Sequence, residues 1–84
     1  MTDLESLIDH LNKKGRPHFI RGPSDQEKSH NIATVVHPDQ PIPFGQASSI
    51  HNKFWGFDGD GKYIGELSAA GLRKEPFQDL LNRL

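Results

Sequence analysis

The segment FWGFDGDGKYIGEL, residues 54–67, decides the fold of this chain. Its centre, DGDG at 58–61, separates two aromatic and β-prone segments whose side chains alternate in character. Glycine supplies the positive φ angle that tight hairpin turns require, so the segment predicts an antiparallel hairpin that turns at 58–61. Trp55 and Phe57 then share one sheet face with Ile64.

The register of this hairpin stays open at the level of sequence. A two-residue turn pairs Phe57 with Ile64, whereas a four-residue loop pairs Trp55 with Ile64. Gly56 and Gly65 leave the opposite face thin, which lets a helix or another backbone come close. The face that carries the aromatic side chains is either core or binding surface.

The acidic turn also has the composition of a calcium loop. An EF-hand loop needs helices on both sides, an oxygen ligand at its first position and a bidentate Glu at its last. If Asp58 and Asp60 are the third and fifth ligands, Gly56 and Leu67 occupy those two positions. The flanking segments are also strand-like. We therefore expect a turn, with no metal site and no cofactor.

Helices are predicted at both ends of the chain. In TDLESLIDHLNKKG, residues 2–15, apolar side chains fall on one helical stripe, Thr2 and Glu5 have capping-box spacing, and Gly15 suits the helix end. In EPFQDLLNRL, residues 75–84, Pro76 precedes a second apolar stripe. The intervening SAAGLRK, residues 68–74, predicts a separate turn or short helix.

Two further segments are typical of strands. PHFIRG at 17–22 is short and alternating, and IATVV at 32–36 is β-branched and apolar. Residues 22–31 and 37–49 are loops by composition. We therefore predict an α+β fold in a single domain, residues 1–84, with an N-terminal helix, a three- to four-stranded antiparallel sheet and a C-terminal helix, both helices covering one sheet face.

Composition excludes several classes of function. The 84 residues carry 10 Lys and Arg against 11 Asp and Glu, so the total charge indicates neither a nucleic acid nor a membrane partner. Cysteine is absent, which excludes disulfides and thiolate metal sites. The acidic start and the lack of a long apolar segment favour a cytoplasmic protein.

No catalytic motif is assembled in the sequence, so we assign no catalytic residue and favour a protein without catalytic activity, with a ribonuclease as the alternative. Histidines do not stand at helical metal-ligand spacing, serines lack a nucleophile elbow, and no glycine-rich phosphate loop is present. The histidines are His10, His18, His30, His37 and His51.

The leading functional hypothesis is a non-catalytic protein-binding protein: an inhibitor, regulator or adaptor. A Pro- and Phe-containing loop at 37–49 and the aromatic hairpin offer apolar anchors for an interface. We expect the partner-binding residues to be Phe44, His51, Trp55 and Phe57. Exposed sheet edges also permit a homodimer.

The alternative hypothesis is an RNA-binding protein or a small, toxin-like ribonuclease. KKGRPHFIR, residues 13–21, gathers basic side chains near the exit of the first helix, where they can contact phosphates or simply complement the helix dipole. His30 is a further candidate for the ribonuclease. The RNA- or phosphate-binding candidates within the segment are Lys13, Lys14, Arg16, His18 and Arg21.

Both ends of the chain resemble a known toxin family. The segments NKKG, FIRGPS and AAGLRKEPFQDLL are similar to the ends of HicA-type mRNA interferase toxins. The resemblance implies a small fold like that of double-stranded-RNA-binding domains and a catalytic His that follows Gly-Ser. Here Asp25 follows Gly22-Pro23-Ser24, and His30 comes several residues later. The aromatic hairpin has no counterpart, so we assign no family.

Overall fold

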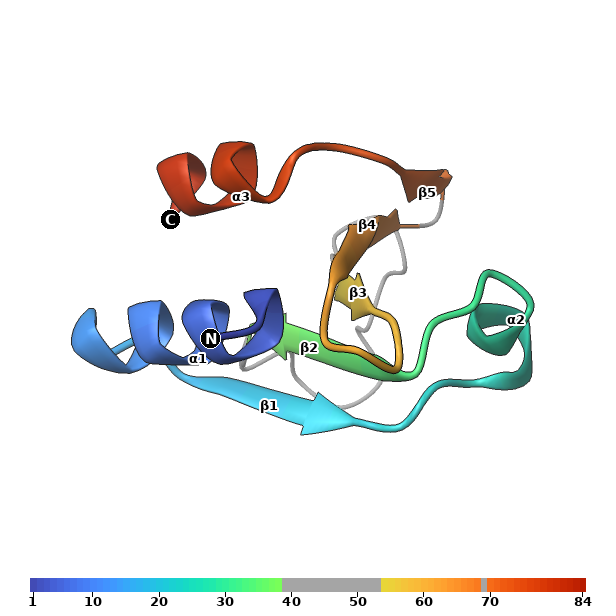
Figure 1. Cartoon of the computed structure of the whole chain (residues 1–84), viewed down its shortest axis with the longest axis horizontal. Coiled ribbons are helices and arrows are strands. Elements are labelled where there is room, and N and C mark those ends of the chain that lie inside the picture. Colours follow the sequence, from blue (N-terminus) through green and yellow to red (C-terminus); the bar gives the residue numbers. More distant parts are fainter. Residues whose placement is uncertain (39–53, 69) are drawn as a thin grey trace, which may run out of the picture.

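Five antiparallel strands lie between an N-terminal and a C-terminal helix in the computed structural model (Figure 1), which describes residues 1–38, 54–68 and 70–84. This confirms the predicted α+β class. The elements are α1 (Asp3–Lys13), β1 (His18–Arg21), α2 (Asp25–Lys28), β2 (Thr34–Pro38), β3 (Phe54–Phe57), β4 (Tyr63–Ser68), β5 (Gly71–Arg73) and α3 (Phe77–Arg83).

The sheet is a meander in which each strand pairs with the next along the chain, in the order β1-β2-β3-β4-β5. β1 therefore forms one edge of the sheet and β5 the other, and Figure 1 shows them at its bottom and top. Every described pair is antiparallel.

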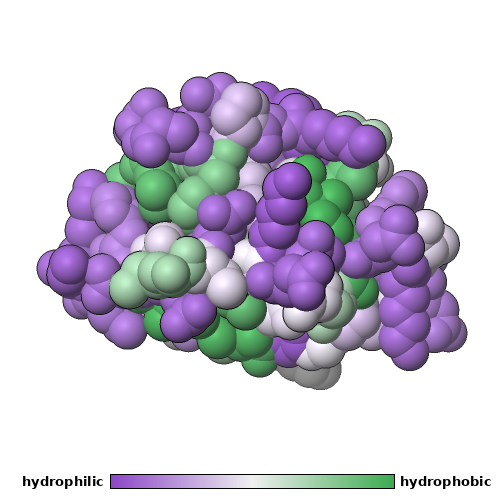
Figure 2. All heavy atoms as spheres, viewed as in Figure 1, coloured by the Kyte–Doolittle hydropathy of each residue, from purple (hydrophilic) through white to green (hydrophobic). Residues whose placement is uncertain are grey.

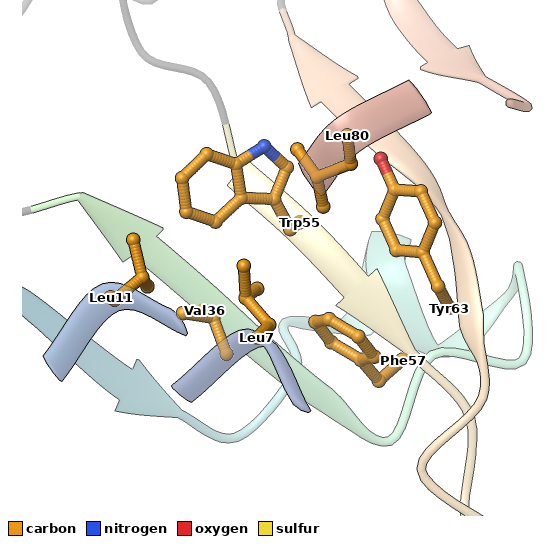
Figure 3. Close-up of a cluster of buried hydrophobic side chains, with 7 residues drawn as sticks. All are labelled: Leu7, Leu11, Val36, Trp55, Phe57, Tyr63 and Leu80. Carbon is orange, nitrogen blue, oxygen red and sulfur yellow. The ribbon is translucent and has the colours of Figure 1, made fainter. Parts of the chain in front are cut away.

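Helices α1 and α3 cover the same face of the sheet, as the sequence predicts. Their buried leucines pack against β2, β3 and β4 in one hydrophobic core (Figure 3), because each helix turns its apolar stripe towards the strands. We call this side of the sheet the helix-covered face. The core residues are Leu7, Leu11, Val36, Trp55, Phe57, Tyr63 and Leu80.

The N-terminus of α1 is fixed by its own cap and by the hairpin turn. Thr2 Oγ1 accepts a hydrogen bond from Glu5 N at 3.1 Å, and Thr2 N donates to Glu5 Oε1 at 3.2 Å, which is the predicted capping box. Leu4 N donates to Gly61 O at 2.9 Å. A Cβ at Gly61 would lie 2.9 Å from the Thr2 side chain, so this close docking requires glycine.

The hairpin forms at the predicted place. Asp58 N donates to Lys62 O and Gly61 N donates to Asp58 O, both at 3.0 Å. The Asp58 carboxylate is used by the turn itself, since its Oδ1 accepts from Asp60 N and Lys62 N at 2.9 Å. Gly61 adopts φ 78°, the positive angle that the turn requires.

From Phe54 to Gly56 the hairpin has the register predicted for a two-residue turn, but at Phe57 it departs from both predicted registers because β4 contains a β-bulge. Phe57 pairs with Tyr63, while Gly56 pairs with Gly65, so Ile64 is an extra residue on β4. The bulge turns Tyr63, in place of Ile64, towards the core beside Phe57, with ring centroids 5.4 Å apart.

Two local elements differ from the sequence prediction. Residues 71–73, expected in a turn or short helix, form β5 and pair with β4. Within the predicted loop 22–31, Asp25–Lys28 forms a single helical turn, because Ser24 and Glu27 make a second capping box. The predicted loop 37–49 lies for the most part outside the described residues. Among those described, no helix is long and apolar enough to cross a membrane.

Candidate binding surface

The predicted partner-binding residues fall into two groups. Trp55 and Phe57 are buried, at 4% and 0% exposure, on the helix-covered face. The indole Nε1 of Trp55 has no hydrogen-bond acceptor in the part of the chain that the structure describes. Phe44 and His51 lie outside the described residues. Direct contact between a partner and either buried aromatic side chain would require α1 or α3 to move.

The predicted basic cluster is dispersed in the fold. Lys13 forms an ion pair with Asp9 at 2.9 Å, and Lys14 Nζ donates to the carbonyl oxygen of Leu84. Arg16 is exposed. Part of the positive charge that would bind RNA phosphates is therefore already engaged in contacts within the protein.

The two remaining residues of that cluster lie on opposite faces of β1. His18 shares its face with Ile20, which pairs with the core residue Val36, whereas Arg21 projects from the other side. His30 is exposed beyond α2. The described residues contain no group of three or more His, Asp and Glu side chains that could hold a metal ion. The strand geometry therefore separates His18 from Arg21, whereas Arg21 and His30 line one groove.

The other side of the sheet, which we call the outer face, carries a row of aromatic side chains. Strand register aligns Phe19 with His37 and Phe54 with Leu67, so these side chains project from the same side. The ring of Phe19 meets that of His37 edge to face, and His37 meets Phe54 at 5.1 Å between centroids. Phe19 is 45% exposed.

Arg21 fixes α2 beside this aromatic row. Its guanidinium lies 5.2 Å from the centre of the Phe54 ring and donates to both carboxylate oxygens of Glu27, at 2.9 and 3.3 Å. Burial raises the pKa of Glu27, but hydrogen bonds from Arg21 and Ser24 outweigh burial and leave this pKa below its usual value. Glu27 is therefore ionised at neutral pH, and its negative charge balances the positive charge of Arg21.

A groove of about 380 Å³ continues from Phe54 across the outer face. Its apolar residues are Phe54, Leu67 and Leu72, which come from three adjacent strands. Polar residues complete the lining, from the β1–α2 segment and from the end of β4 through the start of β5. They are Arg21, Ser24, Gln26, Glu27, His30 and Ser68, and Gly71 adds backbone atoms to the lining.

A separate charged cluster lies where α3 meets the helix-covered face. Arg83 donates to Glu66 Oε2 at 2.7 Å and to Glu75 Oε1 at 2.8 Å, while Tyr63 donates its hydroxyl to Glu75 at 2.9 Å. Hydrogen bonding by Arg83 keeps the pKa of Glu75 low despite burial, and burial raises that of Tyr63. These groups satisfy one another and attach α3 to the sheet, so we assign them a structural role.

Comparison with protein families, with curated proteins and with solved structures finds no match to this chain. The properties of the outer face are therefore derived from its own residues. Sequence reasoning missed Leu67 and Leu72, because Leu72 was assigned to a turn or short helix. The only early signal was the thin face that Gly56 and Gly65 create. At Gly65 an added Cβ would lie 2.6 Å from Arg73 O, so β5 does come close there.

Proposed function

We propose that this chain is a non-catalytic binding protein that recognises another protein through its outer face. The observation that supports this proposal is the continuous path from the half-exposed Phe19, through His37 and Phe54, into the groove at Leu67 and Leu72. A protein–protein interface usually has apolar anchor residues at its centre and polar residues around them.

Charge matching indicates the chemistry of the partner surface. Arg21 and Glu27 neutralise each other at the side of the groove, so an unpaired charge on the partner gains little there. An aliphatic or aromatic side chain, in contrast, would contact Phe54 and both leucines. Figure 2 shows that much of the surface in its view is polar, with apolar areas in separate patches, which fits one localised contact better than a broad apolar interface.

The sequence-based candidates take different places in this proposal. Phe44 and His51 stay proposed contact residues of the same interface. Trp55 and Phe57 would act indirectly, because their burial holds β3 so that Phe54 projects from the outer face. The role as an inhibitor, regulator or adaptor and the cytoplasmic location are parts of the same proposal, and the absence of cysteine is compatible with a reducing compartment.

Two neighbouring residues provide a matched test. Phe19 and Ile20 are 45% and 48% exposed and belong to the same strand, but they project from opposite faces. Tagged wild type, Phe19→Ala and Ile20→Ala proteins would be used to capture partners from host lysate. We expect Phe19→Ala to lose most of a stoichiometric protein partner and Ile20→Ala to retain it. Equal recovery with both variants would reject the outer face as the interface.

RNA is the second candidate, because the aromatic row also suits stacking of unpaired bases and Arg16 is exposed close to it in sequence. The same capture, divided into RNase-treated and untreated halves, separates the two candidates. Recovery of RNA, or of proteins that disappear after RNase treatment, would favour the RNA hypothesis. Binding should then weaken steeply with salt and with Arg16→Ala.

A further inference from the structure

The two edges of the sheet differ in how they are protected against pairing with another strand. β5 has three residues, begins with Gly71 and ends with the exposed Arg73, which Lys74 follows. Short length and positive charge are common protections of an edge strand. β1 is less protected: it is one residue longer, its only fixed charge, that of Arg21, is paired with Glu27, HFIR contains no Lys, no Pro and no acidic residue, and its pairing with β2 is regular.

β1 also carries exposed apolar side chains on both of its faces. Apart from Met1, Phe19 and Ile20 are the exposed large hydrophobic residues of the described chain. Arg21, the only residue of β1 with a fixed charge, is held by Glu27. In Figure 1, β1 forms the bottom of the sheet, with no other labelled strand or helix below it. An edge of this kind is suited to receive a further strand.

We propose that the occupant of this edge is β1 of a second copy, paired antiparallel about a two-fold axis so that the two sheets become continuous. In a parallel pairing, Arg21 would lie beside its own equivalent, which is unfavourable. In the antiparallel pairing, the basic residue Arg16 approaches the end of the second copy where α2 begins at Asp25. Arg16 is exposed and the Asp25 side chain is fully exposed, so both are accessible for this contact.

The two-fold pairing also explains why only one edge needs protection. Both β1 edges are covered in the dimer, and the outermost strands are then the two protected β5 edges. Pairing of β1 with β5 of the next copy would instead generate an open filament. The protection of β5 disfavours that arrangement, so the geometry predicts closed dimers.

The size of the contact sets the expected affinity. A pairing between two four-residue strands, with Phe19 and Ile20 at its centre, is smaller than the interface of a stable complex, which buries roughly 1,200–2,000 Å². We therefore expect reversible self-association with a Kd on the order of micromolar to hundreds of micromolar. This inference does not depend on the proposed recognition of another protein.

Sedimentation equilibrium of the full chain over a wide concentration range tests the dimer. The mass of the wild type should rise towards that of two chains. Ile20→Lys, which places a charge on the edge at a half-exposed site, should stay monomeric with an unchanged far-UV circular dichroism spectrum. Gln78→Lys, the same charge change at an exposed position of α3, should dimerise like the wild type. A wild type that is monomeric throughout, or a dimeric Ile20→Lys variant, overturns the proposal.

A charge exchange tests the antiparallel arrangement. Arg16→Asp and Asp25→Arg should each weaken dimerisation about 3- to 10-fold, and the double variant should recover to within about 3-fold of the wild type. Additive losses in the double variant would exclude this pairing. Capture of an outer-face partner by Ile20→Lys should be unaffected, so failure of the dimer and failure of the proposed function are distinguishable.

Discussion

The two faces of the sheet have similar kinds of side chain but different surroundings. On the helix-covered face, Phe57 is fully buried below α1 and α3, whereas on the outer face Phe19 is 45% exposed. Most of the apolar contact that stabilises the fold therefore lies on one side. The other side also buries Val35, which pairs with Gly56, but its aromatic row of Phe19, His37 and Phe54 stays partly exposed and accessible for binding. Four predictions test this difference, from the largest expected effect to the smallest.

The same substitution on the two faces should have very different costs. Phe57→Ala removes a fully buried ring and should lower the free energy of unfolding by ~3–5 kcal/mol, a large part of the stability of so small a domain. Phe19→Ala should cost less than ~1 kcal/mol. Urea denaturation followed by tryptophan fluorescence measures both. Similar costs would show that the outer face is as important for folding as the core.

Glycine substitutions should separate close packing from open space on the hairpin. Gly65→Ala brings its Cβ to 2.6 Å from the carbonyl oxygen of Arg73 and should cost ~1–3 kcal/mol, because β5 must move away. Gly59→Ala meets no atom within 4 Å and is the control, with an expected change within ~0.5 kcal/mol. If the thermal midpoints of the two variants are equal, β5 is not packed tightly on β4.

The cluster that attaches α3 should make stability dependent on acid. The pKa of Glu75 in the folded state lies below its usual 4.5, so the folded protein releases this proton more readily than the unfolded chain. The stabilisation is present above that usual value and is lost as the pH falls through the lowered folded pKa.

Thermal melting of the wild type between about pH 6 and pH 3 should therefore show a steep loss of stability on the acid side. Glu75→Gln should be less stable at neutral pH, by ~1–3 kcal/mol, with a shallower pH dependence. Asp60→Asn, which removes a carboxylate from an exposed turn position, should retain the wild-type slope. Parallel curves for wild type and Glu75→Gln would place the acid sensitivity elsewhere.

The smallest effect on folding is expected at the Arg21–Glu27 ion pair. Its side chains are 35% and 12% exposed, so Arg21→Ala should lower the free energy of unfolding by only ~0.5–1.5 kcal/mol. Capture of an outer-face partner should fall more, because α2 loses its attachment beside the groove. Lys13→Ala breaks a more exposed pair elsewhere and is the control. If both variants lose binding equally, overall positive charge rather than the groove is responsible.

Local signals made part of the fold predictable. The capping box of α1 and the apolar stripes of both terminal helices determine those helices almost independently of the rest of the chain, and the glycine-rich turn brings β3 and β4 together. The β-bulge was not predictable, since either register kept both aromatic side chains of β3 on one face. β5 was missed because GLR has little strand character. Its pairing depends on the exposed hydrogen-bonding groups of β4, the preceding strand, where Ser68 pairs with Gly71.

The sequence by itself therefore determined the α+β class, the two terminal helices, the position of the hairpin and the sharing of one sheet face by those helices. The helices and the hairpin depend on residues a few positions apart, whose spacing states directly which groups can meet. The shared face was inferred from the apolar stripe of each helix, without showing which face of the sheet the two helices cover. Only the tertiary structure decided that Trp55 and Phe57 are buried, that Phe19 and Ile20 are exposed, and that Phe54, Leu67 and Leu72 line one groove. Burial depends on which face α1 and α3 cover and on where each strand lies in the sheet, and both arise from long-range packing that no local pattern encodes.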